Sequence, residues 1–400
     1  MGISIGICGV GAFANSFIPL FKAHPLVDHV VLCDLDAEKL KAKSEHFGLP
    51  DTCPSLDDLC DTDVDAIAVI TQNWLHGPQA LQCLRAGKHT YSAVPTGLTA
   101  QEVEDLVRAV EETGLIYMLG ETSYYRPAAI YCRKHFAAGD FGRIVYGEGH
   151  YYHDWDHGLY DVARWRGGEQ WRETGGTPPM YYPTHSTSLI MSVTGAHATH
   201  VACFGVADDH DDGVYDPEVN WWGNPFSNES ALLLMSDRSV CRVNEFRRIG
   251  HPGAVHMSLY GTEGGFEEHV GSRVWVTKNH ADTTDLTALL APVGVAVEPE
   301  AGPAGEADMA KVTDLTTHVG ASAVHDVARL PREFIGLPNG HEGAHQFLVD
   351  DFVKACAEGH TPPNNVWWAA RYMLPGIIAH ESAVRGGELM EVPDFGDPPA

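Results

Sequence analysis

The stretch that decides the fold is Gly-Val-Gly-Ala-Phe-Ala at residues 9–14 of a 400-residue chain. It directly follows a short apolar run at 3–8 and opens a segment expected to be helical. In a strand–turn–helix unit, glycines let the backbone approach a pyrophosphate at the helix N-terminus. The pattern G-x-G-x-x-A in this context therefore predicts a dinucleotide site.

The first 121 residues alternate short apolar runs with amphipathic segments. We expect strands at 3–8, 30–33, 66–70, 90–92 and 116–119, and helices at 37–47, 77–86 and 100–113. This alternation is typical of a doubly wound parallel sheet. The fold class predicted is α/β, with an N-terminal Rossmann domain at residues 1–121.

The pattern changes in residues 122–400. A helix is expected at 127–138, followed by extended runs at 144–152, 199–204, 230–235, 239–245 and 256–261 and by helices at 343–356 and 366–386. A Pro/Gly/Ala-rich stretch at 292–308 is expected to be a surface excursion. We predict an α+β domain with a large, mostly antiparallel open sheet that binds substrate and mediates self-association. Its C-terminal helices are candidates for packing back on the first domain.

Composition excludes several classes of partner. The chain has 54 acidic against 26 basic residues and a formal net charge of −28, which argues against nucleic acid and anionic membranes. It has no run of 18 apolar residues and no leader with a cleavage site, so neither a membrane span nor a signal peptide is expected. Nine cysteines without a C-x-x-C pair predict reduced thiols and a cytoplasmic location.

Asp34 stands at the end of the second expected strand, 20 residues after Ala14. An acid at this place binds the ribose hydroxyls and would repel a 2′-phosphate, so NAD is predicted rather than NADP. The alternative interpretation is structural: turn glycines and an aspartate that caps a helix.

Further motifs follow the later strands. Residues 71–76 (Thr-Gln-Asn-Trp-Leu-His) come after the third strand and residues 86–89 (Ala-Gly-Lys-His) precede the fourth. With the glycine turn, these resemble the Gfo/Idh/MocA family of sugar oxidoreductases, and the resemblance extends over nearly the whole chain. It implies NAD as cofactor, with contacts from Gly9, Gly11, Ala12, Phe13, Ala14, Asp34, Thr71, Asn73, His76, Glu121 and Arg172.

The main departure from that family lies after the fourth strand. Family dehydrogenases carry Glu-Lys-Pro there, and the lysine assists proton transfer, whereas this chain has Ala93-Val94-Pro95. The NAD-dependent glycoside hydrolases of family 109 also have valine before the proline. This chain resembles them in the segments 151–153 (Tyr-Tyr-His) and 182–185 (Tyr-Pro-Thr-His). It departs from them at Ala93 and at 341–343, where their His-Gly-Gly is His-Glu-Gly. The chain also resembles, more loosely, NAD-dependent sulfoquinovosidases.

The resemblance implies a glycosidase mechanism of C3 oxidation, C2 deprotonation, aglycone elimination, water addition and re-reduction. We expect Tyr151 to act as base at C2 and His185 to handle the C3 hydroxyl proton. Tyr182 is expected to orient the substrate or protonate the leaving group. His153 and Arg166 are the expected substrate contacts. These roles can be exchanged without contradicting the sequence.

Other interpretations stay open at this stage. One is a plain sugar or inositol dehydrogenase in which His185 or Tyr182 replaces the lysine, and another is a non-catalytic NAD-binding sensor. We expect no metal, because His150 and His153 lie on a strand whose side chains alternate between faces. The sequence does not identify the sugar, which is neutral or carries an N-acetyl, carboxylate or sulfonate group.

Overall fold

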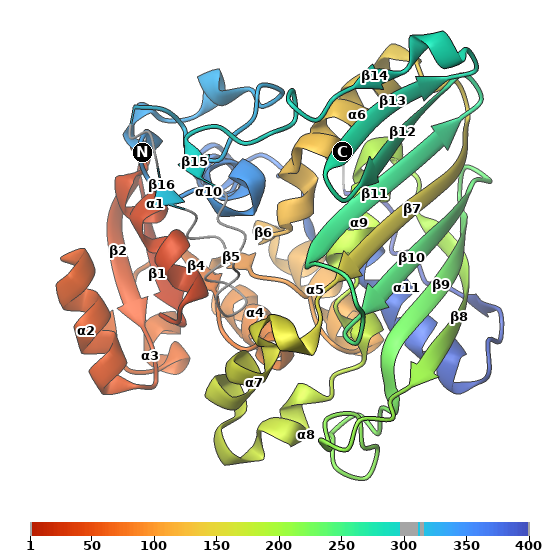
Figure 1. Ribbon diagram of the computed structural model, residues 1–400. Helices are drawn as coiled ribbons and strands as arrows, with labels where there is room; N and C mark the ends of the chain where they lie inside the picture. Colours follow the sequence, from red (N-terminus) through yellow and green to blue (C-terminus); the bar gives the residue numbers. More distant parts are fainter. Residues whose placement is uncertain (1, 297–310, 313–315, 399–400) are drawn as a thin grey trace.

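The computed structural model describes residues 2–296, 311–312 and 316–398, and these form two large sheets (Figure 1). The N-terminal sheet has the order β3-β2-β1-β4-β5-β6, and each strand is parallel to its neighbours. Its strands are β1 (Ile3–Cys8), β2 (Val27–Cys33), β3 (Thr52–Cys53), β4 (Ala66–Val69), β5 (His89–Ser92) and β6 (Tyr117–Leu119). The predicted Rossmann-type parallel sheet is confirmed.

Helices connect these strands, and local signals fix several of their ends. They are α1 (Ile18–Ala23), α2 (Ala37–Phe47), α3 (Leu56–Cys60), α4 (His76–Arg85) and α5 (Ala100–Thr113). Thr99 and Glu102 form a capping box at the start of α5, and Gly114 ends it with φ +67°. The expected helix directly after the glycine turn is wrong in detail. Residues 13–16 form a 3₁₀ turn, and α1 begins only at Ile18, so that Pro19 falls in its first turn, where a missing N–H is tolerated.

The second sheet has nine strands in the order β14-β13-β12-β11-β7-β10-β9-β8-β17. Only β7 and β10 pair in parallel, so the predicted mostly antiparallel open sheet is confirmed. The strands are β7 (Ile144–Tyr152), β8 (Ala198–Ala207), β9 (Phe226–Met235), β10 (Val240–Phe246), β11 (Ala254–Gly261), β12 (Gly264–His269), β13 (Ser272–Thr277), β14 (Thr284–Asp285) and β17 (Met390–Glu391). A separate pair is β15 (Val295–Ala296) and β16 (Lys311–Val312).

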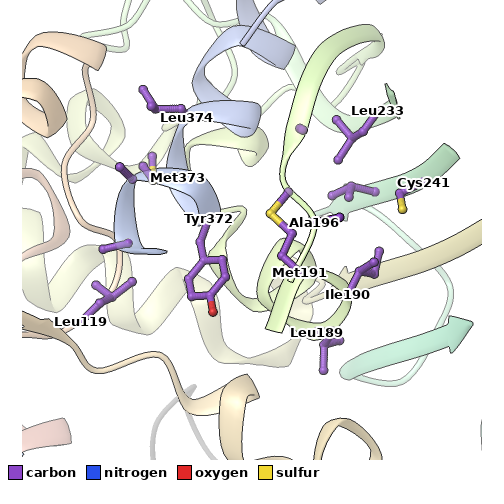
Figure 2. Packing of buried hydrophobic residues seen from close by; sticks show 14 of the residues in the cluster. Leu119, Leu189, Ile190, Met191, Ala196, Leu233, Cys241, Tyr372, Met373 and Leu374 are labelled. Atoms are coloured by element: carbon purple, nitrogen blue, oxygen red, sulfur yellow. The ribbon is translucent and has the colours of Figure 1, made fainter. Parts of the chain in front are cut away.

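Helices cover one face of this sheet. They include α6 (Pro127–Ala138), α9 (Thr184–Thr194) and α11 (Val366–Val384). Figure 2 shows Leu189, Ile190 and Met191 of α9 between Leu233 and Cys241 of the sheet and the 372–374 segment of α11. The sequence pattern missed α9 because its first turns are rich in serine and threonine, which have low helix propensity. Tertiary burial decides the conformation here, since residues 184–191 are all buried.

Helix α10 (Gly340–Glu358) follows most of the nine-stranded sheet in the sequence, but it packs on the N-terminal parallel sheet. The ring of Phe352 lies 5.6 Å from that of Tyr91 and 6.5 Å from that of Phe21. The chain therefore returns to the parallel sheet at α10, whereas α4, α5 and β6 share a separate buried cluster with the nine-stranded sheet.

The opposite face of the nine-stranded sheet exposes apolar side chains, among them Phe204, Leu232 and Leu234. Most of the predicted surface excursion at 292–308 falls outside the described residues. Among the residues that are described, no helix is both long and apolar enough to cross a membrane.

We predict that Phe352→Ala destabilises the protein by about 3–5 kcal/mol, because it empties a fully buried aromatic site where α10 meets the parallel sheet. Urea unfolding monitored by circular dichroism measures the change. The control is Leu35→Ala, since Leu35 is 86% exposed and lies outside the nine-stranded sheet; it should shift the free energy of unfolding by less than about 0.5 kcal/mol. Equal effects of the two variants would contradict the packing described.

Candidate active site

A single large cavity of about 2190 Å³ runs from the glycine turn to the inner face of the nine-stranded sheet. This exceeds the roughly 300–1,000 Å³ of ordinary ligand pockets, so it has room for more than one small molecule. One end is lined by the glycine turn, Asp34 and Asp57. The lining also includes Val94 from the parallel-sheet part of the chain and Tyr151, Tyr182 and His185 from the part after residue 121.

The glycine turn has the geometry that its sequence predicts. Gly9 has φ +92°, and a Cβ there would lie 2.3 Å from the carbonyl oxygen of Ile70, so only glycine fits. The Oδ2 atom of Asp34 accepts a hydrogen bond from the Val10 backbone N–H at 3.0 Å. Asp34 therefore braces the turn while it also lines the cavity.

Most residues predicted to contact the cofactor line this cavity: Gly9, Gly11, Ala12, Phe13, Asp34, Thr71, Asn73 and His76. The buried Oδ1 atom of Asn73 has no hydrogen-bond partner, so it is a free acceptor at the wall. His76 is different, because both of its ring nitrogens lie 3.1 Å from backbone carbonyls, those of Thr71 and Pro95. Because both nitrogens have backbone partners, His76 stabilises the cavity wall rather than offering a polar atom to a ligand.

Three predicted cofactor residues lie elsewhere. Ala14 is fully buried in the core behind the turn, where its small size allows close packing. Arg172 lies outside the cavity: its Nε donates to the Asp212 carbonyl at 2.7 Å, and its guanidinium stacks 4.4 Å from the Trp171 ring. Glu121 is completely buried behind His185. None of these three residues lines the cavity, and their contact with the cofactor stays a prediction.

Glu121 orients His185. It follows β6, and its Oε1 lies 2.7 Å from His185 Nδ1 at the start of α9. Burial opposes ionisation of Glu121, but His185, the Thr184 hydroxyl and the Ser123 N–H outweigh it and lower its pKa. An ionised carboxylate only accepts, so His185 Nδ1–H donates, and its Nε2 is left as the proton acceptor.

The predicted catalytic residues form one cluster. The ring of His185 lies 5.3 Å from that of Tyr151 and 5.4 Å from that of Tyr182, and the two tyrosine rings stack at 5.9 Å. Tyr151 comes from β7, whereas Tyr182 and His185 flank the Pro183 corner that begins α9. The substrate contacts predicted at His153 and Arg166 line the same cavity.

A tyrosine that acts as a free base needs a lowered pKa, but the pKa of Tyr151 is raised. Burial raises it, although Arg247, 4.8 Å from its ring, and Arg166 oppose the shift. Its O–H lies 2.8 Å from Nδ1 of His153. Burial, aided by Arg247 and His157, lowers the pKa of His153 to about 3. The neutral His153 ring therefore accepts a hydrogen bond from the Tyr151 hydroxyl.

Val94 lines the centre of the cavity, where the related dehydrogenases have their lysine. Within the described lining, lysine side chains occur only at the nucleotide end. Lys39 Nζ lies 3.0 Å from Asp34 Oδ1, and Lys43 Nζ lies 2.7 Å from Asn15 Oδ1. Among the lining residues, Tyr151, Tyr182 and His185 form a cluster of groups able to carry protons.

Sequence reasoning missed one supporting pair. Glu245 and Arg247 are buried beneath Tyr151, and the Arg247 guanidinium donates to Glu245 at 3.0 Å. Ser186 donates to the same carboxyl group, whose pKa burial raises to about 8. The alternation along β10 could have indicated that Glu245 is buried, because it lies on the same inward-facing side as the apolar residues 241 and 243.

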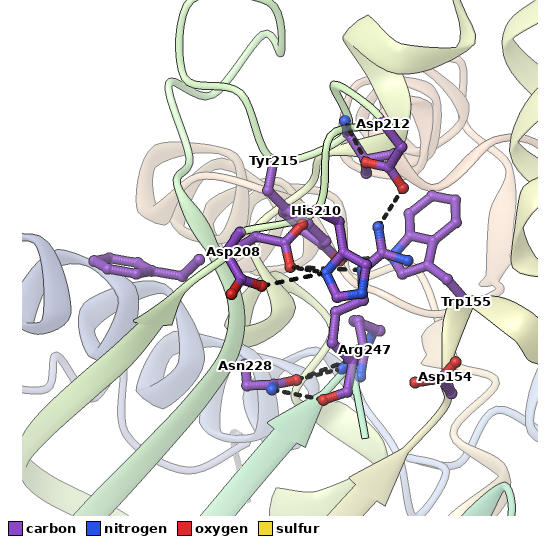
Figure 3. A network of polar contacts seen from close by, with 12 residues as sticks. Asp154, Trp155, Asp208, His210, Asp212, Tyr215, Asn228 and Arg247 are labelled. Carbon is purple, nitrogen blue, oxygen red and sulfur yellow. Dashed lines mark hydrogen bonds and ion pairs between the residues drawn. The ribbon is translucent and has the colours of Figure 1, made fainter. Parts of the chain in front are cut away.

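A polar network anchors the segment between β7 and α9 (Figure 3). Trp155 donates to the Tyr215 hydroxyl at 2.9 Å, and Arg248 pairs with Asp212. The group of possible metal ligands found among the described residues is Asp208, Asp209 and His210, where Arg248 already lies 3.6 Å from Asp208. His150 and His153 diverge as expected, toward Glu148 and Tyr151 respectively.

Comparison with known proteins supports the family resemblance in the Rossmann part of the chain. Residues 3–121 match the Gfo/Idh/MocA model, described as an oxidoreductase family with an NAD-binding Rossmann fold. The resemblance predicted from the sequence is confirmed. The NAD-binding fold also agrees with the glycine turn and with Asp34.

Relatives extend the likeness over the whole chain. A glycosyl hydrolase family 109 protein of Streptomyces niveus is 25% identical over 98% of this chain and 77% of its own length. A levoglucosan dehydrogenase solved with NADH and levoglucosan superposes with a TM-score of 0.73 at 17% identity, over 99% of this chain and all of its own. An oxidoreductase domain protein from Kribbella flavida gives 0.72 at 19%, over 98% and 100%. At these identities the solved structures show the fold alone.

We predict that Gly9→Ala weakens NADH binding at least about tenfold, which corresponds to about 1.4 kcal/mol. The added Cβ meets the Ile70 carbonyl and strains a left-handed turn. Fluorescence titration with NADH measures the change. Gly87→Ala is the control, because it has φ +80° but nothing within 4 Å of the new Cβ. Unchanged affinity in Gly9→Ala would place the dinucleotide elsewhere.

A second prediction concerns pH. The pKa of Glu121 is lower in the folded state than its unfolded value of about 4.3. Its stabilisation is therefore present above that value and lost as the pH falls through the folded pKa. Glu121→Gln should cost about 1–3 kcal/mol at pH 7, and the difference from wild type should shrink at pH 4. Urea unfolding at both pH values tests this, and a difference independent of pH would show that Glu121 is not ionised.

Proposed function

We propose that this chain is an NAD-dependent glycosidase that works by transient oxidation of its sugar. The observation that carries the proposal is the cluster of Tyr151, Tyr182 and His185 in a cavity that also contains the glycine turn, with Val94 in place of a lysine. The name of the full-length relative from Streptomyces niveus supports the same activity.

The glycine turn, Asp34 and Asn73 are the residues that would hold the dinucleotide. When bound, NAD⁺ supplies reversible hydride acceptance at C3 of the sugar. His185 Nε2 takes the C3 hydroxyl proton during oxidation and returns it during reduction. Glu121 stabilises the imidazolium formed in between, because the two groups are hydrogen-bonded and buried.

Tyr151 serves as the base at C2. Its phenol passes its own proton to His153 Nδ1, 2.8 Å away, as it takes the C2 proton, which the C3 ketone has made acidic. Arg247, stacked on the Tyr151 ring, holds that ring in place for the relay. Tyr182 protonates the aglycone oxygen as the C1–O bond breaks. Tyr182, now a phenolate, takes a proton from water as the hydroxide adds to C1. Tyr151 gives a proton to C2 as it recovers its own from His153, so all three side chains return to their starting protonation.

A sugar dehydrogenase is the second candidate, favoured by the likeness to levoglucosan dehydrogenase. It requires His185 to take over the whole role of the missing lysine. It gives no role to the hydrogen bond between Tyr151 and His153. In either case we propose self-association through the exposed face of the nine-stranded sheet, where Phe204 and Leu232 are exposed.

The test is a panel of chromogenic glycosides in deuterium oxide. We predict cleavage without net formation of NADH and with deuterium at C2 of the released sugar. Tyr151→Phe should lower kcat by at least about 100-fold, the usual worth of a general base, while NADH affinity stays within about twofold. Tyr146→Phe, on the same strand and outside the cavity, is the control. Accumulation of NADH without C2 exchange would establish the dehydrogenase instead.

A further inference from the structure

Five of the nine cysteines lie together beside the nucleotide end of the cavity. Four of them are buried in one small cluster and the fifth packs against it: Cys8 on β1, Cys33 on β2, Cys53 on β3, Cys83 on α4 and Cys60 at the end of α3. In the parallel sheet, Cys33 stands opposite both Cys8 and Cys53. Cys8 and Cys33 also line the cavity, directly before Gly9 and Asp34. The thiols therefore adjoin the residues that would hold the dinucleotide.

A hydrogen bond joins the thiols of Cys60 and Cys83 where α3 packs on α4. This bond lowers the pKa of Cys60, although burial opposes the shift, and Lys88 supports it. The same bond, together with burial, raises the pKa of Cys83. Cys60 is only half-buried, whereas Cys83 is fully buried. Because the thiolate is the reactive form of cysteine, Cys60 is the nucleophile of the pair and Cys83 is the protonated thiol beside it.

The two helices that carry these thiols also form part of the cavity wall. Asp57 lies one turn before Cys60 on α3, and Gln82 directly precedes Cys83 on α4. Asp57 and Gln82 both line the cavity, and Gln82 Nε2 donates to Asp57 Oδ1 at 2.6 Å. A disulfide bond is about 2.0 Å long, much shorter than the hydrogen bond between thiols that it would replace. Forming it therefore draws α3 and α4 together and shifts this part of the wall.

We propose that a peroxide converts Cys60 and Cys83 into a disulfide, and that this bond weakens dinucleotide binding. The Cys60 thiolate attacks one oxygen of the peroxide, the O–O bond breaks, and Cys60 becomes a sulfenic acid. The Cys83 sulfur then attacks the Cys60 sulfur, and the S–O bond breaks. The protons of both thiols leave with the oxygens as water, so the thiols are oxidised while hydrogen peroxide is reduced to water. Neither step needs a sugar or the cluster around His185.

Treatment with hydrogen peroxide followed by peptide mapping tests the modification. We expect a disulfide between Cys60 and Cys83 in the wild-type protein, and oxidation of Cys60 at least about tenfold faster than that of Cys356, because reactivity follows thiolate character. Cys356 on α10 is the matched control, since it is also half-buried but burial raises its pKa. A disulfide between other cysteines instead, or equal rates at Cys60 and Cys356, would overturn the proposal.

Two variants separate the roles of the thiols. Cys83→Ser should accumulate the sulfenic acid at Cys60, where dimedone captures it, because the second thiol is missing. Cys60→Ser should form no disulfide at Cys83 under the same treatment. If Cys83→Ser does not fold, the wild-type peptide map and Cys60→Ser decide. A disulfide at Cys83 in Cys60→Ser would show that Cys60 is not the reacting thiol.

Fluorescence titration with NADH before and after oxidation measures the effect on the cofactor. We expect the oxidised protein to bind NADH at least about fivefold more weakly, as for an ordinary coupling between two sites, and to recover on reduction with dithiothreitol. By linkage, saturating NADH should shift the thiol–disulfide equilibrium in a glutathione buffer toward the dithiol by the same factor. Peroxide-treated Cys60→Ser is the control and should keep its affinity. Equal NADH affinities of oxidised and reduced wild type would overturn the proposal.

Discussion

The hydrogen bond between Glu121 and His185 is the contact on which the site depends. Glu121 ends the parallel sheet that carries the glycine turn, and His185 begins a helix of the second half of the chain. This buried hydrogen bond therefore connects the cavity wall that would hold a dinucleotide to His185, the residue proposed to transfer protons. It also fixes the tautomer, so that the acceptor nitrogen Nε2 is the one left for the substrate.

The electrostatics around this contact favour neutral groups at rest and charge during reaction. Burial raises the pKa of Tyr151 and lowers that of His153, so the proton of their hydrogen bond stays on the tyrosine. Arg166 and Arg247 oppose burial at Tyr151. A valine at position 94 adds no competing charge at the centre. This arrangement fits chemistry in which protons move among fixed side chains while the redox cofactor is restored in each cycle.

Much of this was predictable because the signals are local. The glycine turn, the strands of the parallel sheet and the place of Asp34 follow from short patterns, and the resemblance grouped residues 151, 182 and 185, which the structure brings together. Long-range burial was not predictable. Helix α9 has weak helical propensity and forms because both of its neighbours bury it. No pattern indicated that Glu121 hydrogen-bonds to His185. The contacts of Arg172 with Trp171 and Asp212 likewise depend on loops that no pattern specifies.

The central claim is that the nicotinamide ring reaches the cluster formed by Tyr151, Tyr182 and His185. A crystal structure of the protein soaked with NAD⁺ measures this directly. The account predicts the pyrophosphate at the turn of residues 9–14 and the nicotinamide ring in contact with Tyr182 or His185. A dinucleotide whose nicotinamide points away from that cluster, toward Asp57 or bulk solvent, would contradict it.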